Sequence, residues 1–359
     1  MSTSSIPENL IQEMPDDGVI EAIESCFDAG WTDGLPVVPP SRPAVEAMLA
    51  AGPWEADEIL LVEPVRDRQV SALKIAANAV MAGCRPEYFP VVGAVFQAMS
   101  DPRFNLHMPA TSTGGAAIVT VVNGPIRDRL GIHYKENLLG PGFRANATIG
   151  RCVRLVLRNC LSVIPGTLDK STQGWPGKYS CCFGEDESAS PWEPYHVANG
   201  FAADQSTVTI FAGEGCHNLL NHGSADAEGL LMTFADSMAA AGSFSPGPSL
   251  IVVAPEHAKK LEGWDRTQVQ EFLYENASRT LADLKRLGKC EADDGAATYW
   301  VRSGLTPLPG DEEKIIHRGQ SPEDIHLFVG GGDAGGHSAF FPSWSRGPSV
   351  PAVTYPIPG

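Results

Sequence analysis

Cysteine and histidine residues in three short polar segments are the residues of this sequence best suited to chemistry. Each segment also carries glycine or proline: 213–218 (GEGCHN), 255–257 (PEH) and 330–337 (GGGDAGGH). Near neutral pH a thiol can serve as a nucleophile, and an imidazole can serve as a general base or a metal ligand. We therefore take Cys216, His217 and His337 as the candidate catalytic residues.

An apolar run typical of a buried strand precedes each of these segments. The three runs are 208–212 (VTIFA), 250–254 (LIVVA) and 325–329 (IHLFV). Helical periodicity over 225–241 and 265–289 separates them, and Asp265 with Gln268 could form a capping box at the start of the second helix. Strands that alternate with helices indicate a Rossmann-like parallel sheet with covering helices. Because ligands bind at the carboxyl ends of parallel strands, we expect His217, His257 and His337 to lie together at one edge.

The glycine-rich loop 330–336 is suited to binding an anion. Glycine has no Cβ, so the backbone can approach a ligand closely and direct N–H groups at it. The predicted substrate-binding residues here are Gly331, Gly332, Gly335 and Gly336. The loop does not match the GxGxxG pattern and has no P-loop lysine, which disfavours a dinucleotide. The alternative is a tight turn that passes beneath a neighbouring segment.

A metal site is a second interpretation of the same region. Cys216, His217 and His222 lie within seven residues of one another. Thiolate and imidazole are common zinc ligands, so His217 and His222, with His337 as a further candidate, could bind a transition metal such as zinc. The alternative is that Cys216 is a buried thiol and the histidines are hydrogen-bonded structural groups. The sequence indicates no other cofactor.

Arg144 is the candidate residue of the N-terminal half. It lies in the run 140–146 (GPGFRAN), directly before a predicted helix over 146–163. Exposed N–H groups at a helix start bind anions, and a guanidinium pairs with a carboxylate, so the two together predict a carboxylate clamp. The alternative is an ordinary helix cap by Asn146, with Arg144 in solvent.

The chain is long enough for two hydrophobic cores, since single cores stop growing at about 250–300 residues. We expect an N-terminal α+β domain over 1–164, an irregular arm over 165–205 and a Rossmann-like α/β domain over 206–359. The arm is rich in aromatic residues but has no periodicity, so we expect it to contact a second copy of the chain in a homo-oligomer. Within the arm, the run 178–187 (KYSCCFGEDE) predicts that Cys181 faces a core and that the acidic residues face water.

Composition and charge exclude several classes of partner. The net charge is -17 and no basic stripe is present, which disfavours nucleic acids and anionic membrane surfaces. No apolar run reaches the ~18 residues that span a bilayer, and the N-terminus has no signal-peptide pattern, so we expect a cytoplasmic protein. The eight cysteines show no CxxC spacing, which suits a reducing compartment.

Four long stretches carry a resemblance to a known family: WTDGLPVVPPSRPAVEAML, AANAVMAGCRPEYFPVV, LGPGFRANATIGRCVRLVLRNC and APEHAKKLEGWDRTQVQEFLYENA. The chain resembles bacterial proteins that accompany small thioredoxin-like (seleno)proteins of the UGSC type. The resemblance implies partnership with a redox thiol or selenol on a thioredoxin-like protein. This sequence contains neither CGSC nor UGSC, so such a group would belong to another polypeptide.

The sequence therefore favours a small-molecule enzyme, or the substrate-binding subunit of a two-component enzyme. We expect it to cleave a carbon–heteroatom bond in a polar or anionic substrate with thiol or metal assistance, as an oxidoreductase or a lyase. One alternative is a metal-dependent hydrolase or lyase that uses His217 and His222. Another is a non-catalytic scaffold subunit.

Overall fold

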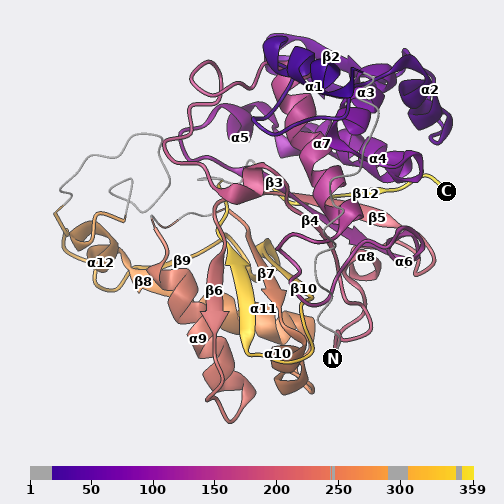
Figure 1. Ribbon diagram of the computed structural model, residues 1–359. Coiled ribbons are helices and arrows are strands. Elements are labelled where there is room, and N and C mark those ends of the chain that lie inside the picture. The colour runs from indigo at the N-terminus through magenta and orange to yellow at the C-terminus, as the bar shows by residue number, and fades with distance from the viewer. Residues whose placement is uncertain (1–17, 243, 245–246, 290–305, 345–349) are drawn as a thin grey trace, which may run out of the picture.

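Two four-stranded sheets form the centre of the molecule (Figure 1). Helices cover them, so the predicted α/β class is confirmed. The computed structural model describes residues 18–242, 244, 247–289, 306–344 and 350–359. Within these ranges, no helix combines the length and the apolar character needed to span a membrane.

The first sheet has the strand order β12-β5-β3-β4. Its strands are β12 (Val353–Pro356), β5 (Thr207–Gly213), β3 (Ala117–Asn123) and β4 (Cys182–Gly184). β3 is antiparallel to β5 along its whole length and parallel to β4. All residues of β3, β4 and β5 are buried, as their mainly apolar sequences lead one to expect.

The second sheet is mixed, with the order β10-β7-β11-β6. Its strands are β10 (Ile325–Val329), β7 (Ser249–Val253), β11 (His337–Phe341) and β6 (His217–Leu220). β10 and β7 are parallel neighbours, as predicted, but β11 is antiparallel to both β7 and β6. The expectation that residues 208–212 join this sheet is wrong, because they lie in β5 of the first sheet. An apolar run predicts a buried strand, but it does not identify the partner strand.

Helices α4 (Phe89–Met99) and α7 (Arg144–Leu161) pack on the first sheet, and α3 (Ala72–Ala82) packs against α7. Nearly every residue of α4 is buried, because its sequence is apolar on all sides. The remaining elements of this half are α1 (Val19–Asp28), α2 (Arg42–Ala50), β1 (Ile59–Glu63), β2 (Arg68–Ser71), α5 (His107–Thr111) and α6 (Ile126–Leu130).

The second sheet has its own covering helices. They are α9 (Ala227–Ala240), α10 (Pro255–Lys260) and α11 (Arg266–Asn276). The predicted start of α11 is confirmed by a capping box, in which Asp265 and Gln268 each accept a hydrogen bond from the other's backbone N–H. The prediction of one helix over 265–289 is wrong, because α11 ends at Asn276 and a short strand follows it. The outlying elements are β8 (Ser278–Thr280), α12 (Leu281–Arg286) and β9 (Ile315–His317).

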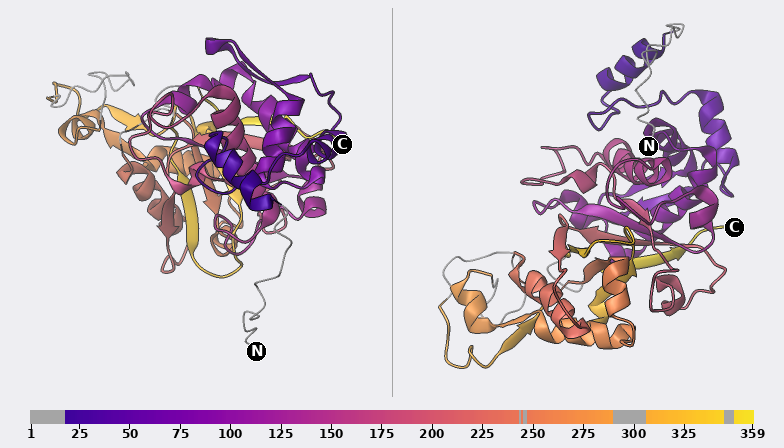
Figure 2. Two further views of the ribbon diagram at one scale, coloured as in Figure 1. Left: turned by 45° about the horizontal axis from the view of Figure 1, so that its top comes forward. Right: turned by 60° about the horizontal axis from the view of Figure 1, so that its bottom comes forward.

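The two sheets face each other across a shared apolar core. Val119 and Phe211 of the first sheet and Val252, Phe328 and Phe341 of the second belong to one buried cluster. Figure 2 shows the purple helices on the outer side of the first sheet and the orange helices on the outer side of the second. Because β5 and β12 join β3 and β4, the first sheet combines strands from distant parts of the chain.

Residues 165–205, called the central segment below, are as irregular as predicted. Their only regular elements are η4 (Pro176–Lys178), β4 and α8 (Tyr195–Ala198). Phe183, Trp192 and Tyr195 are nevertheless buried within this chain. These aromatic side chains are not available to a second copy, so they no longer support the homo-oligomer, which stays a prediction.

The acidic part of the central segment is buried, contrary to the expectation that its acids face water. Glu185 and Asp186 are 0% and 1% exposed, while Cys181 is buried as expected. The side chain of Asn123 and the backbone N–H of Tyr195 donate hydrogen bonds to the Glu185 carboxylate. Burial raises the pKa of Glu185 to about 7, because water no longer stabilises its charge.

Candidate functional site

Helix α7 presents two arginines to the central segment. Gly150, Arg154 and Arg158 recur at intervals of four residues, so they share one face of the helix. Arg151 lies on another face and forms a two-point ion pair with Asp33, at 2.8 and 2.9 Å. Arg154 and Arg158, on the first face, line a cavity between α7 and the central segment.

Two glycines let the central segment pack closely at this cavity. A Cβ at Gly150 would lie only 2.8 Å from the backbone nitrogen of Cys181, so the segment contacts the α7 backbone directly. A Cβ at Gly177 would overlap the indole ring of Trp175. The missing side chains thus allow Trp175 and Lys178 to lie beside α7.

Asp169 is the centre of a charged network in this cavity. Its carboxylate accepts hydrogen bonds from Arg154 Nη2 at 2.9 Å and from Lys178 Nζ at 2.7 Å. The Ser171 hydroxyl donates to the same carboxylate at 2.5 Å and accepts from Lys178 Nζ at 2.6 Å. Asp169, Ser171 and Lys178 are therefore each held by at least two hydrogen bonds.

Burial acts on both partners of the Lys178 and Asp169 pair. For Asp169, burial opposes ionisation, but the hydrogen bonds from Lys178 and Ser171 outweigh it and lower the pKa to about 2. For Lys178, burial lowers the pKa below its ordinary value, and the hydrogen bond to Asp169 only partly opposes this effect. The ammonium of Lys178 is therefore easier to deprotonate than that of an exposed lysine.

Two buried donors of the same cavity have no acceptor. Arg158 Nε and Trp175 Nε1 are inaccessible to water and lack a hydrogen-bond partner within the described ranges. A buried N–H without a partner costs about 1–3 kcal/mol, so unpaired donors are rare in folded proteins. Both side chains line the cavity, whose volume is about 520 Å³.

We name this cavity the basic pocket and define it by Arg154, Arg158, Asp169, Ser171, Trp175 and Lys178. Three of these side chains are cationic and one is anionic. Asp33 also lines the cavity, but its charge is balanced by Arg151. The pocket therefore carries an excess of positive charge in a chain whose net charge is -17.

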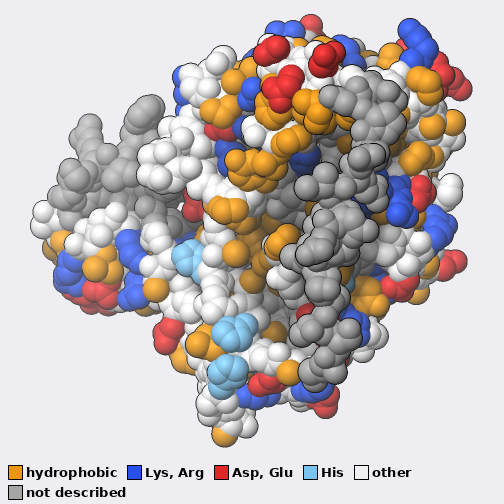
Figure 3. Space-filling view, viewed as in Figure 1, with side chains coloured by type: hydrophobic (Ala, Val, Ile, Leu, Met, Phe, Trp, Pro, Cys, Tyr) orange, Lys and Arg blue, Asp and Glu red, His pale blue; other side chains and the backbone are white. Residues whose placement is uncertain are grey.

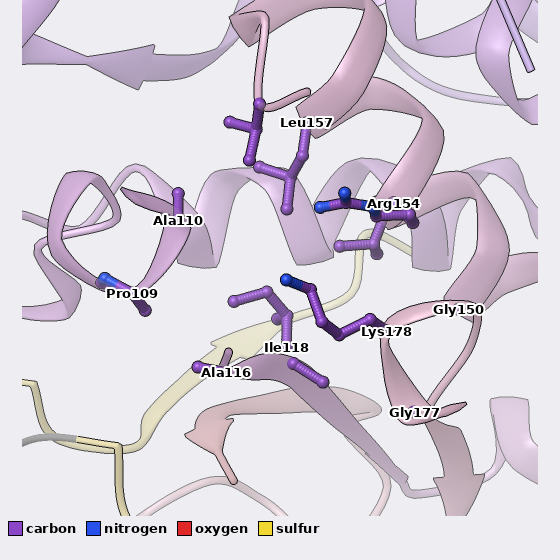
Figure 4. Close-up of a pocket in the computed structure, with 12 residues that line it drawn as sticks. Pro109, Ala110, Ala116, Ile118, Gly150, Arg154, Leu157, Gly177 and Lys178 are labelled. Carbon is purple, nitrogen blue, oxygen red and sulfur yellow. The ribbon is translucent and has the colours of Figure 1, made fainter. Parts of the chain in front are cut away.

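An apolar chamber lies against the basic pocket and shares Arg154 and Lys178 with it. The chamber has a volume of about 20 Å³, and its apolar walls include Ala110, Ile118 and Leu157. Figure 4 shows the charged ends of Arg154 and Lys178 directed toward each other between these apolar side chains. This low-dielectric surface is the physical reason for the strong desolvation of Lys178.

A second cavity contains most of the site residues expected from the sequence. Its volume is about 420 Å³, and we name it the glycine-loop pocket for its lining residues Cys216, His217, Gly331, Gly332, Gly335 and His337. Residues 137–140, in the loop between α6 and α7, also line it. Cys216, His217 and the glycine-rich loop thus line one pocket, but the predicted edge of three parallel strands is wrong. β6 and β11 bring these segments together, and His257 does not line the pocket.

Strand geometry separates the two candidate histidines. In the register of β6 and β11, His337 pairs with Leu220 and His217 pairs with Phe340. Paired residues of neighbouring strands share a face, so His337 lies on the same face as Leu220. Successive residues of a strand alternate between faces, and His217 lies three positions from Leu220, so His217 points to the opposite face. The His217 ring lies 5.9 Å from that of Phe340, and burial lowers its pKa. Histidines are exposed on the face that carries β6 (Figure 3).

His337 is oriented by a neighbour on its own face of the sheet. Its Nδ1 lies 3.2 Å from the side-chain oxygen of Asn218, and its ring lies 5.4 Å from that of His222. Cys216 at the same pocket is exposed as a residue, yet partial desolvation raises the pKa of its thiol. A thiol with a raised pKa is mostly protonated near neutral pH, which weakens it as a nucleophile.

The described ranges contain no group of three or more His, Cys, Asp or Glu residues that could hold a metal ion. His222 instead contacts His337 edge to face, and its Nδ1 lies 3.4 Å from the backbone nitrogen of Gly336. The predicted pair of His217 and His222 therefore has no third ligand among the described residues, and geometry does not favour the metal interpretation.

Most backbone donors of the glycine-rich loop are already occupied. Gly331 donates to the carbonyl of Tyr134 at 3.0 Å, and Gly335 donates to the carboxylate of Glu256 at 2.6 Å. A Cβ at Gly336 would overlap the backbone carbonyl of Asn221. These contacts match the predicted alternative, a tight turn that passes beneath neighbouring segments. Of the four glycines predicted to bind substrate, Gly332 alone has a backbone N–H without a hydrogen-bond partner in the described ranges.

The other two residues singled out by sequence have structural partners. Arg144 is the first residue of α7 and donates to the carbonyl of Gly83 at 3.1 and 3.0 Å, so it binds the C-terminus of α3 and does not line either pocket. His257 is buried, with Nδ1 at 2.7 Å from the Ser338 hydroxyl and Nε2 at 2.8 Å from the carbonyl of Asn221.

Comparison of the chain with protein-family models, with curated proteins and with solved structures gives no significant match. Sequence reasoning missed the basic pocket because its residues lie on one helix and in the irregular central segment. The available signal was the spacing of Gly150, Arg154 and Arg158, which places two arginines and a small residue on one helical face.

Proposed function

We propose that this protein is a small-molecule enzyme whose substrate carries a carboxylate or phosphate group, and that the basic pocket is its active site. The observation that carries the proposal is the pair of buried, unpartnered donors, Arg158 Nε and Trp175 Nε1, in a cavity with excess positive charge. An anionic ligand bound to the Arg158 guanidinium would balance this charge, and a small rotation of either side chain would let the ligand accept the unpaired hydrogen bonds.

The hydrogen-bond network suits catalysis as well as binding. Lys178 and Ser171 are held within 2.6 Å of each other, and Asp169 fixes both of them. Groups that are ordered before the substrate arrives need no reorganisation during the reaction. Arg158, which has no partner within the described ranges, would bind the anion, while Lys178 and Ser171 would face the reacting carbon.

Binding of inorganic phosphate, measured by isothermal titration calorimetry, tests this proposal. We expect the wild-type protein to bind phosphate and Arg158→Gln to weaken binding by about tenfold or more, because a charge-assisted hydrogen bond contributes about 1.5–3 kcal/mol. Arg85→Gln is the matched control, since it removes the same charge from a residue that is exposed and does not line the pocket. Equal loss of affinity in both variants would show a diffuse charge effect and would contradict the proposal.

The glycine-loop pocket is the alternative location for the substrate. His337→Ala and Arg144→Gln test the residues that the sequence favoured, and we expect both variants to bind phosphate as the wild type does. Loss of phosphate binding in His337→Ala with retention in Arg158→Gln would move the active site to the glycine-loop pocket. The partnership with a thioredoxin-like protein, implied by the family resemblance, remains a separate proposal.

A further inference from the structure

We propose that Lys178 forms a covalent imine with the carbonyl carbon of an oxo acid bound in the basic pocket. This inference rests on the proposed function, because it assigns the substrate class and the reacting atom of the same pocket. It requires three conditions: an amine that can lose its proton, a binding group for the acid, and a nearby group that transfers protons.

The first condition is met by the position of the Lys178 side chain. It lines both the basic pocket and the apolar chamber, and its side chain is only 16% exposed. A lysine becomes a nucleophile when desolvation or a neighbouring cation favours the neutral amine. Both influences act here: burial lowers the pKa of Lys178, and the positive charge of Arg154 acts in the same direction.

The second condition is met by the arginine without a partner. Arg154 is engaged with Asp169, whereas Arg158 lines the pocket with its buried Nε unpaired. Trp175, whose buried Nε1 is also unpaired, lines the same cavity. A carboxylate bound by Arg158 and Trp175 would leave the adjacent carbonyl group to face Lys178, which is the arrangement of atoms in a 2-oxo acid.

The third condition is met by Ser171. Its hydroxyl is within hydrogen-bond distance of both Lys178 Nζ and the Asp169 carboxylate, at 2.6 and 2.5 Å. A hydroxyl so placed can give a proton to the carbonyl oxygen and receive one from the amine nitrogen. Asp169 keeps the hydroxyl in position and is itself held by Arg154 at 2.9 Å.

The reaction balances without an oxidant, reductant or metal. Lys178 first gives one proton to solvent, and the lone pair of the neutral amine then forms a C–N bond as the carbonyl π electrons move to oxygen. Ser171 relays one proton from the nitrogen to that oxygen, which gives a hydroxyl group. The proton first given to solvent then returns to this hydroxyl, which leaves as water as the protonated C=N bond forms. One water is released for each imine, and the protonated imine withdraws electrons from bonds at the neighbouring carbon.

Borohydride trapping tests the proposal directly. The full-length protein is incubated with pyruvate or 2-oxoglutarate, reduced with sodium borohydride and digested, and the modified peptide is identified by mass spectrometry. We expect one adduct per chain, located on Lys178. We also expect inorganic phosphate to suppress this adduct, because it competes for the same pocket.

Two lysine variants serve as controls. Lys178→Arg keeps the positive charge but cannot form an imine, so we expect it to lose the adduct. Lys170→Arg changes a lysine of the same segment that does not line the pocket, and we expect it to keep the adduct. If Lys178→Arg does not fold, the phosphate competition on the wild-type chain still decides the question.

The outcomes separate this inference from the proposed function. Binding of phosphate and oxo acid at Arg158 without an adduct on Lys178 would overturn the imine and leave the anion site intact. An adduct on Lys170 or other exposed lysines that phosphate does not suppress would also overturn it, as nonspecific labelling. Failure of the wild type to bind phosphate or an oxo acid would contradict the proposed function itself.

Discussion

The glycine-loop pocket and the basic pocket differ in how their residues are arranged along the chain. The first is lined by short runs next to strands, with conspicuous glycines, a thiol and histidines. The second is lined by residues of one helix and an irregular segment. The first has most of its polar groups already paired, whereas the second contains buried donors without partners.

This difference shows that a motif with reactive residue types is not by itself a reactive site. In the glycine-loop pocket, the protein's own groups, Glu256 and Tyr134, accept the backbone hydrogen bonds that a ligand would need. In the basic pocket, Arg158 and Trp175 lack acceptors among the described residues. Unpaired buried donors point to a ligand more directly than glycine content does.

The largest expected difference between the pockets concerns stability. Asp169→Ala leaves Arg154 and Lys178 without their shared anion, and we expect a loss of about 3 kcal/mol in the free energy of unfolding. His337→Ala removes an exposed side chain with one side-chain hydrogen bond, and we expect a change within about 0.5 kcal/mol. Urea unfolding of both variants measures these two losses in free energy. Equal losses would mean that the charged network stabilises the fold no more than the His337 side chain does.

Substitution of glycine should separate the pockets by ligand binding. In Gly177→Ala the new methyl group overlaps Trp175 and displaces its ring, so we expect phosphate affinity to fall by about fivefold, or about 1 kcal/mol. In Gly336→Ala the methyl group meets the carbonyl of Asn221, which should lower stability without changing phosphate affinity. Calorimetry on both variants is the measurement, and weaker phosphate binding in Gly336→Ala would indicate that the two pockets are coupled.

The pH dependence of stability should report on Asp169. Its pKa is lowered from 3.8 to about 2 in the folded chain, so ionised Asp169 stabilises the fold above the unfolded pKa. This contribution is lost as pH falls from about 4 through about 2. We expect the free energy of unfolding of the wild type to fall more steeply over this pH range than that of Asp169→Asn. If the two plots of unfolding free energy against pH are parallel, the pairing of Asp169 with Lys178 is contradicted.

The smallest expected effect is that of Cys216→Ser. Because Cys216 is exposed, the substitution should change stability by no more than about 0.5 kcal/mol and leave phosphate affinity unchanged. Iodoacetamide should alkylate this thiol at a rate that rises mainly above neutral pH, because desolvation raises its pKa. Protection of Cys216 by phosphate would show that the glycine-loop pocket also binds the anion.

Local sequence was sufficient to predict features that depend on neighbouring residues. The α/β class, the capping box of Asp265 and Gln268, the buried runs of β5, β7 and β10, and the irregular central segment are all found in the structure. These features follow from hydrophobic periodicity and from backbone chemistry within a few residues. Convergence of His217, His257 and His337 was predicted from their places after strands, but of these three residues only His217 and His337 line one pocket.

Tertiary structure decided which of these residues have free chemical groups. Strand register turned His217 away from His337, and the partner choice of β5 placed it in the other sheet. Packing of the central segment on α7 brought Lys178 to Asp169 and Arg154, although no motif connects these positions in the sequence. Burial, register and pairing are properties of contacts between distant segments, and one sequence read locally does not contain them.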